Sequence, residues 1–150
     1  MNSANDEANR LEARKQFELE LTLNPGDALS EYQLGELMWI ANRPDDALKR
    51  FLRAVELQPN FPHALIAAGK VLLSTEKADE AIALLKKAVS LDPSNEVAHY
   101  RLAQAFQKSG DQAGAAREFG EFRRLRSALE SLRGIYRQLL ENRITTQSIE

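Results

Sequence analysis

A short phrase, Leu-x-Pro, recurs along this chain at a fixed interval of 34 residues. It occupies residues 23–25, 57–59 and 91–93. A fourth copy would begin at Leu125, but Ser127 stands where its proline would be. A constant period of this length indicates one supersecondary unit that is stacked several times, rather than a single irregular globular fold.

Other residue types keep the same interval. Small residues recur at two positions of each unit: Gly35, Gly69 and Ala103 at the first, and Ala47, Ala81 and Ala115 at the second. The apolar residues between them follow helical spacing, with no useful strand-like alternation. Small side chains let two helix backbones approach closely, and the closing proline denies the next turn a donor. The sequence therefore predicts an all-α chain of paired helices, with Asp27, Asn60, and Ser94 or Asn95 as N-caps of the following helices.

The period also predicts the boundaries of the units. Residues 1–7 are expected to be a disordered tail and 8–27 a half repeat that supplies only a second helix. Residues 28–61, 62–95 and 96–129 form the three full units. The third unit is expected to run into a helix that caps the stack and ends at about residue 142, with 143–150 as a tail.

The long final helix follows from the missing proline at Ser127. It carries an apolar seam with 3-4-3-4-3 spacing, made of Phe122, Leu125, Leu129, Leu132, Tyr136 and Leu139. Such a seam can cover the open end of a repeat stack, or it can pair with another chain as a short coiled coil. We favour the cap, because the seam is barely three heptads long.

These residues resemble the tetratricopeptide repeat (TPR), a 34-residue helix–turn–helix with a small residue in the first helix, an alanine and an aromatic in the second, and a closing proline. The resemblance covers about residues 11 to 126. It implies a right-handed α-α superhelix of three repeats, with a leading half repeat and a long C-terminal helix. Phe122 departs from the pattern, since a small residue is usual there, and suggests an atypical terminal repeat.

The resemblance also implies a binding surface, because the first helices of successive repeats line a concave groove that takes a peptide or a partner protein. Carried over by position, this groove would be lined by Tyr32, Glu36, Trp39, His63, Ile66, Lys70, Leu73, Tyr100, Arg101, Gln104 and Gln107. Trp39 can equally serve as core packing between the paired helices. The family's clamp for C-terminal carboxylates, built from Lys, Asn and Arg, is not assembled at these positions.

Composition narrows the function classes. The formal net charge is −2, so no global basic field recruits nucleic acid, and the cluster of Arg123, Arg124 and Arg126 is interleaved with glutamates. The chain has no cysteine, which is compatible with any compartment, and no apolar run approaches the roughly 18 residues needed for membrane insertion. The first residues lack the basic and apolar regions of a signal peptide.

We find no catalytic constellation, no cofactor motif and no metal-binding pattern. His63 and His99 are the only histidines and fall at different phases of their helices, so we expect one at the groove edge and one in helix packing. The sequence thus predicts a non-enzymatic scaffold or adaptor that binds a protein or peptide in the groove. The alternative is a structural module that self-associates, as a homodimer, through the C-terminal helix and the open repeat ends.

Overall fold

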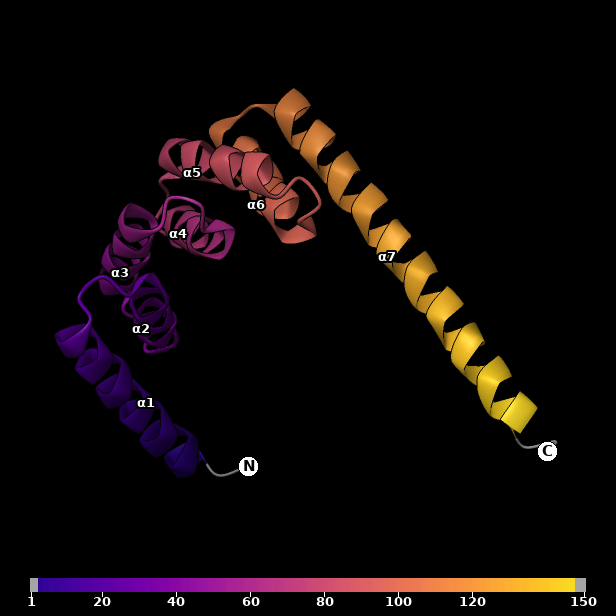
Figure 1. Ribbon diagram of the computed structural model, residues 1–150. Coiled ribbons are helices and arrows are strands. Elements are labelled where there is room, and N and C mark those ends of the chain that lie inside the picture. Colours follow the sequence, from indigo (N-terminus) through magenta and orange to yellow (C-terminus); the bar gives the residue numbers. More distant parts are fainter. Residues whose placement is uncertain (1–2, 148–150) are drawn as a thin grey trace.

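Seven α-helices make up the computed structural model, which describes residues 3–147 and contains no strand within that range (Figure 1). In chain order they are α1 (Ser3–Leu23), α2 (Ala28–Ile40), α3 (Pro44–Leu57), α4 (Pro62–Ser74), α5 (Ala78–Leu91), α6 (Glu96–Ser109) and α7 (Gln112–Gln147). The most extensive packing joins α2 with α3, α4 with α5 and α6 with α7, so the three predicted repeats are three helix pairs. The pairs stack into a curved solenoid. None of the helices within the described residues is long and apolar enough to cross a bilayer.

The small residues of each pair lie where the two helices come closest. A Cβ added at Gly35 would lie 2.5 Å from Cε1 of Phe51, and one added at Gly69 would lie 2.7 Å from Cγ of Leu85. Phe51 and Leu85 are fully buried, as is Ala103 in the third repeat. The predicted steric role of the small residues is therefore confirmed.

The core runs along the whole stack and joins each pair to the next. One cluster links the first repeat to α4 through Met38, Phe51 and Val71, and another links the second repeat to α6 and α7 through Leu85 and Phe106. Because each pair packs only on its neighbours, the stack gains stability repeat by repeat, as solenoids do.

The Leu-x-Pro phrase ends helices as predicted. Helices α1, α3 and α5 each finish at the leucine of the phrase, whereas Ser127 lies inside the uninterrupted α7. Asp27 caps α2 through the amide of Leu29, and Asn95 caps α6 through the amide of Ala98.

The predicted cap at Asn60 is wrong. The N-cap of α4 is Phe61, which makes no side-chain capping hydrogen bond. Pro62 occupies the first turn of the helix, where its fixed φ angle favours helix initiation and its missing N–H costs nothing.

Both ends of the chain are more helical than predicted. Helix α1 begins at Ser3, so residues 3–7 of the expected tail are helical, and residues 1 and 2 lie outside the described range. Helix α7 continues past residue 142 to Gln147, and the hydroxyl of Thr145 donates back to the carbonyl of Glu141 as in a regular turn. Only residues 148–150 of the expected C-terminal tail lie outside the described range.

The second half of α7 does not form the expected cap. The helix has 36 residues, about 54 Å at 1.5 Å per residue, and its only helix contacts are with α6. The seam residues Leu129, Leu132, Tyr136 and Leu139 are 41–61% exposed. Because no proline or turn interrupts the helix after residue 126, the seam is carried away from the stack instead of folding over its end (Figure 1).

Candidate partner-binding groove

The first helices of the three repeats, α2, α4 and α6, form the inner face of the curved stack, and α3 and α5 form the outer face (Figure 1). Inner helices contact each other, α2 with α4 and α4 with α6, so their exposed side chains form one continuous surface. We call this surface the inner groove.

Three adjoining hollows make up the inner groove. The first, of about 260 Å³, is lined by Tyr32, Glu36, His63, Ile66, Ala67, Lys70, Asn95, Val97 and Arg101. The second, of about 530 Å³, is lined by Trp39, Lys70, Leu73, Ser74, Arg101, Gln104 and Lys108. The third, of about 410 Å³, extends to α7 and is lined by Glu96, Val97, Tyr100, Arg101, Phe122 and Arg126. Arg101 borders all three hollows and therefore lies at their junction.

The structure places ten of the eleven predicted groove residues around these hollows. The exception is Gln107, which is exposed on α6 but lines none of them. Trp39 serves both predicted roles, because it lines the second hollow and also packs against the core cluster that contains Met38 and Phe51.

Lys70 is held at the centre of the groove by two neighbours from α2. Its Nζ lies 3.6 Å from Oε1 of Glu36 and 4.9 Å from the centroid of the Trp39 ring. A cation over an indole face is attracted by the ring quadrupole, and the carboxylate adds a charge-assisted contact. The ammonium group of Lys70 is thus held between the Trp39 ring and the Glu36 carboxylate.

Arg101 is oriented by uncharged groups. Its Nη1 donates to Oε1 of Gln104 at 3.0 Å, and its guanidinium lies 5.9 Å from the centroid of the Tyr100 ring. Nε2 of Gln104 in turn donates to the hydroxyl of Tyr100 at 3.3 Å. Within the described residues no carboxylate pairs with Arg101, so its charge is available to a ligand at the junction of the hollows.

Lys108 is a groove residue that the sequence interpretation missed. Its Nζ donates to the backbone carbonyl of Leu73 at 3.0 Å and lies 3.6 Å from Oε1 of the exposed Glu76. Lys108 stands one helical turn after Gln104, so the i, i+4 spacing of α6 could have predicted that it lines the groove. The position carried over from the family instead indicated Gln107.

Tyr32 forms the aromatic end of the groove. Its ring lies 5.8 Å from that of Phe51 and 5.2 Å from that of Phe61, both tilted, which is a favourable arrangement for aromatic pairs. Burial raises the pKa of the Tyr32 phenol above its usual value, and the negative charge of Glu36 raises it further. Tyr32 therefore presents a neutral hydroxyl to the groove at physiological pH.

The two histidines occupy different environments. His99 is buried, with Nδ1 2.6 Å from Oε2 of Glu118 and Nε2 2.9 Å from the carbonyl of Pro93, so it ties α6 to α7. His63 is exposed and borders the first hollow. Among residues 3–147 no three histidine or acidic side chains are placed to hold a metal ion together.

In the arginine cluster of α7, Arg123 and Arg124 are exposed on the helix surface, whereas Arg126 also borders the third hollow. Arg124 donates to Oε2 of Glu121 at 2.8 Å, and this hydrogen bond lowers the pKa of the Glu121 carboxyl. Arg126 lies 3.6 Å from Oε1 of Glu130. These contacts between exposed side chains on one helix are typical of surface pairing.

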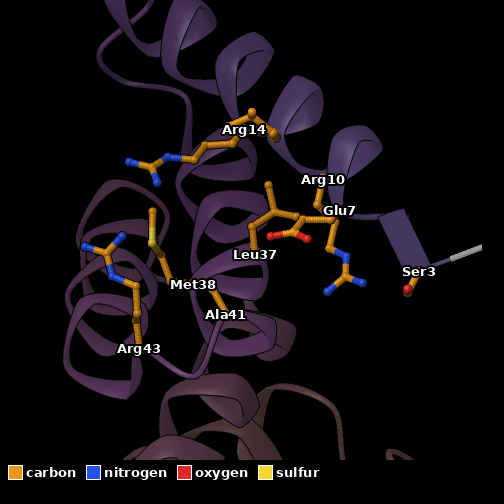
Figure 2. A pocket seen from close by; sticks show the side chains of 9 residues that line it. Ser3, Glu7, Arg10, Arg14, Leu37, Met38, Ala41 and Arg43 are labelled. Carbon is orange, nitrogen blue, oxygen red and sulfur yellow. The ribbon is translucent and has the colours of Figure 1, made fainter. Parts of the chain in front are cut away.

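A further cavity of about 530 Å³ separates α1 from α2 at the N-terminal end of the stack. Figure 2 shows Glu7, Arg10 and Arg14 of α1 on one side and Leu37 and Met38 of α2 on the other.

One residue that lines this cavity departs from the repeat pattern. Position 14 corresponds by the 34-residue period to Leu48 and Ile82, which pack against the core between repeats. Arg14 instead pairs with Glu18 at 2.8 Å, so the apolar contact that closes the other repeats is missing here.

Comparison with known proteins agrees with this architecture. Residues 69–110 match the family model of the TPR repeat. A crystal structure of MamA superposes with a TM-score of 0.76 at 21% identity, covering 84% of this chain and 74% of that one. A MamA fragment (41-end) from Desulfovibrio magneticus RS-1 gives a TM-score of 0.72 at 23% identity, covering 82% and 70%. YrrB, described as a TPR protein with an unusual peptide-binding site, gives 0.71 at 23% identity, covering 85% and 68%.

At these identities the structural likeness establishes the fold. The family match over residues 69–110 and the close contacts at Gly35 and Gly69 agree with this fold. Residues 69–110 therefore match a TPR repeat, and the chain has the fold of an all-α TPR solenoid.

Proposed function

We propose that the inner groove binds a peptide segment or helix of a partner protein by non-covalent contacts alone. The observation that carries this proposal is the junction at Arg101, where three hollows meet around a cation that has no acidic partner among the described residues. Lys70, Lys108 and Arg126 border the same surface, so the groove offers four positive groups beside aromatic side chains. Aromatic side chains and arginine are the residues that most often dominate binding energy in protein interfaces.

The chemistry of the groove favours a ligand with apolar and acidic side chains. Trp39, Tyr32 and Tyr100 supply flat surfaces for apolar groups, and the four cations supply hydrogen-bond donors for carboxylates. The peptide-binding site named for YrrB gives a precedent on the same fold, at the level of analogy. Because the groove binds and releases its ligand unchanged, the role proposed for this chain is that of a scaffold or adaptor and not of an enzyme.

The test is a peptide selected against the chain from a displayed library, followed by fluorescence anisotropy with variants. Tyr32→Ala and Lys70→Ala are expected to weaken binding by at least tenfold, because the first removes the aromatic end of the groove and the second its central cation. Lys87→Ala, on the exposed outer face of α5, is the matched control and should bind as tightly as the wild type. Circular dichroism checks that all three variants stay folded. Unchanged binding by both groove variants would show that the peptide uses another surface.

Self-association is the second candidate function, and one observation favours it. The seam of α7 exposes Leu129, Leu132, Tyr136 and Leu139 together, and an apolar stripe of this kind usually has a partner. Light scattering on the wild type and on Leu132→Glu tests the idea. It predicts an oligomer that the variant dissociates, and a wild type that is already monomeric would refute it.

A further inference from the structure

The two terminal helices both leave an apolar stripe exposed. On α1, Leu19 and Leu23 are 54% and 74% exposed, and Leu11, which borders the cavity between α1 and α2, is 54% exposed; we call these three residues the α1 stripe. The α7 seam, from Leu129 to Leu139, is its counterpart at the other end of the stack. The two stripes lie on surface helices that each contact only one neighbouring helix.

The α7 seam is bordered by positive charge along one edge only. Arg126, Arg133 and Arg137 follow each other at i, i+7 and i+11, which places them on one side of the seam. Arg126 pairs with Glu130, but within residues 3–147 no carboxylate pairs with Arg133 or Arg137. The opposite edge is uncharged.

This asymmetry is unfavourable for the pairing of one α7 seam with another. In a parallel pair each arginine row would face the uncharged edge of the partner, and in an antiparallel pair the two rows would face each other. Neither arrangement supplies the opposite charges that usually flank a coiled-coil seam, and the antiparallel arrangement places like charges side by side.

The α1 stripe has the complementary charge. Helix α1 contains five acidic residues against three basic ones, whereas residues 126–147 contain four arginines against two glutamates. Around the helix Glu12 lies between Leu19 and Leu23, and Glu20 lies beside Leu23. Both glutamates are exposed, and among the described residues neither pairs with a cation; the carboxylate of Glu12 accepts from Gln16.

The two helices also match in length and direction. Helix α1 has 21 residues, about 32 Å, and the free part of α7 from residue 126 to 147 spans about 33 Å. Both project from the curved stack toward the same side, the lower side in Figure 1. Because α1 and α7 lie at opposite ends of the stack, α1 of one molecule can contact α7 of a second molecule.

We propose that the free half of α7 in one molecule packs on the α1 stripe of a second copy of this chain, with Arg133 and Arg137 against Glu12 and Glu20. The proposal rests on the self-association function and specifies its contact. It differs from α7–α7 pairing in one decisive respect, because only here does α1 take part.

The test uses charge reversal on the full chain, with mass measured by light scattering at low salt. The wild type is expected to show at least twice the 16.9 kDa mass of one chain. Glu12→Lys/Glu20→Lys should weaken association by at least tenfold, because α1 and α7 would then both be basic. Association that survives this variant overturns the proposal and leaves α7–α7 pairing as the self-association contact.

A mixing experiment provides the matched positive control. Arg133→Glu/Arg137→Glu should also fail to self-associate, since both of its terminal helices would be acidic. An equimolar mixture of the two double variants should associate again, because each contact then joins one acidic and one basic helix. Failure of the mixture to associate, with both variants folded by circular dichroism, contradicts the proposed contact.

Two other outcomes would also overturn the proposal. A monomeric wild type removes self-association as a whole, while peptide binding in the inner groove would remain testable by itself. A monomeric wild type that binds vesicles of anionic phospholipid would show that the basic seam of α7 contacts a membrane surface instead of a second copy.

Discussion

Substituting alanine for glycine should have opposite effects at two positions of this solenoid. Gly35 lies in α2 against Phe51, and Gly120 lies in α7 with no other atom within 4 Å of the place its Cβ would take. The chemical change is the same in both variants, one methyl group added within a helix. Their comparison therefore separates the close helix contact from the ordinary gain in helix propensity.

The magnitudes follow from the geometry. A Cβ at Gly35 would lie 2.5 Å from Cε1 and 2.6 Å from Cδ1 of Phe51, whereas carbon atoms pack best at about 3.5–4.0 Å. Phe51 is fully buried and has no free space to move into, so an overpacking cost of about 2–3 kcal/mol applies. The higher helix propensity of alanine offsets about 1 kcal/mol of this cost, so Gly35→Ala should lower the free energy of unfolding by about 1–2 kcal/mol. Gly120→Ala gains helix propensity without an overpacking cost, so it should raise the free energy of unfolding by about 0.5–1 kcal/mol.

Thermal unfolding followed by circular dichroism measures both effects. For a chain of this size, about 1 kcal/mol corresponds to about 2–4 °C in Tm, so Gly35→Ala should unfold about 2–8 °C below the wild type and Gly120→Ala about 1–4 °C above it. Gly69→Ala should behave like Gly35→Ala, because its Cβ would meet the buried Leu85. A Tm for Gly35→Ala at or above that of the wild type would refute the view that these small residues set the spacing within each repeat.

Three further predictions concern a cap, a titration and a buried pair. Asp27→Ala should lower the free energy of unfolding by about 1 kcal/mol, because it removes the N-cap of α2, whereas Asn60→Ala should change it by less than about 0.5 kcal/mol; urea unfolding compares the two. Because the pKa of Tyr32 is raised in the folded state, its contribution to stability should be fully present below a pH of about 10 and should be lost as the pH rises through the folded pKa. Glu36→Gln should lower the folded pKa of Tyr32, which phenolate absorbance measures. His99→Ala should cost about 2 kcal/mol in urea unfolding, because it removes the contacts of the buried imidazole with Oε2 of Glu118 and the carbonyl of Pro93 and leaves only Arg117, 3.7 Å from Oε1, beside that carboxylate. A cost below about 1 kcal/mol would show that the pair is not structural.

The helix pairs could be predicted from the sequence because the signals that define them repeat. Gly35 and Gly69 occupy the same position one period apart, and the contacts they make are the same. The Leu-x-Pro phrase is local as well, since a proline acts on the turn in which it stands. A sequence pattern that recurs in phase therefore predicts the same helix contact in each repeat.

The ends of the chain were harder to predict, because they depend on contacts between helices that do not repeat. The seam of α7 has the spacing of a packed helix face, but spacing does not reveal whether the helix turns back onto the stack. The cavity beside α1 is lined by Arg14, at a position where the other repeats have the apolar Leu48 and Ile82.

The groove illustrates the same division between repeating and individual features. The positions carried over from the family resemblance identified most of the residues that line the inner face, including Lys70 and Arg101, because helix geometry gives corresponding side chains the same direction in each repeat. They missed Lys108 and included Gln107, which lies on the same helix but borders no hollow. That the charge of Arg101 has no acidic partner among the described residues is a property of the packed structure, and no spacing rule reports it.

The most direct test of the proposed function is photo-crosslinking of a selected peptide to the chain. A benzoylphenylalanine introduced at Ile66, on the inner face, is compared with one introduced at Lys87, on the outer face of α5. We expect the peptide to be crosslinked by benzoylphenylalanine at position 66 and not at position 87, and we expect Lys70→Ala to reduce the crosslinking. Capture from Lys87 in place of Ile66 would contradict the central claim that the partner binds in the inner groove.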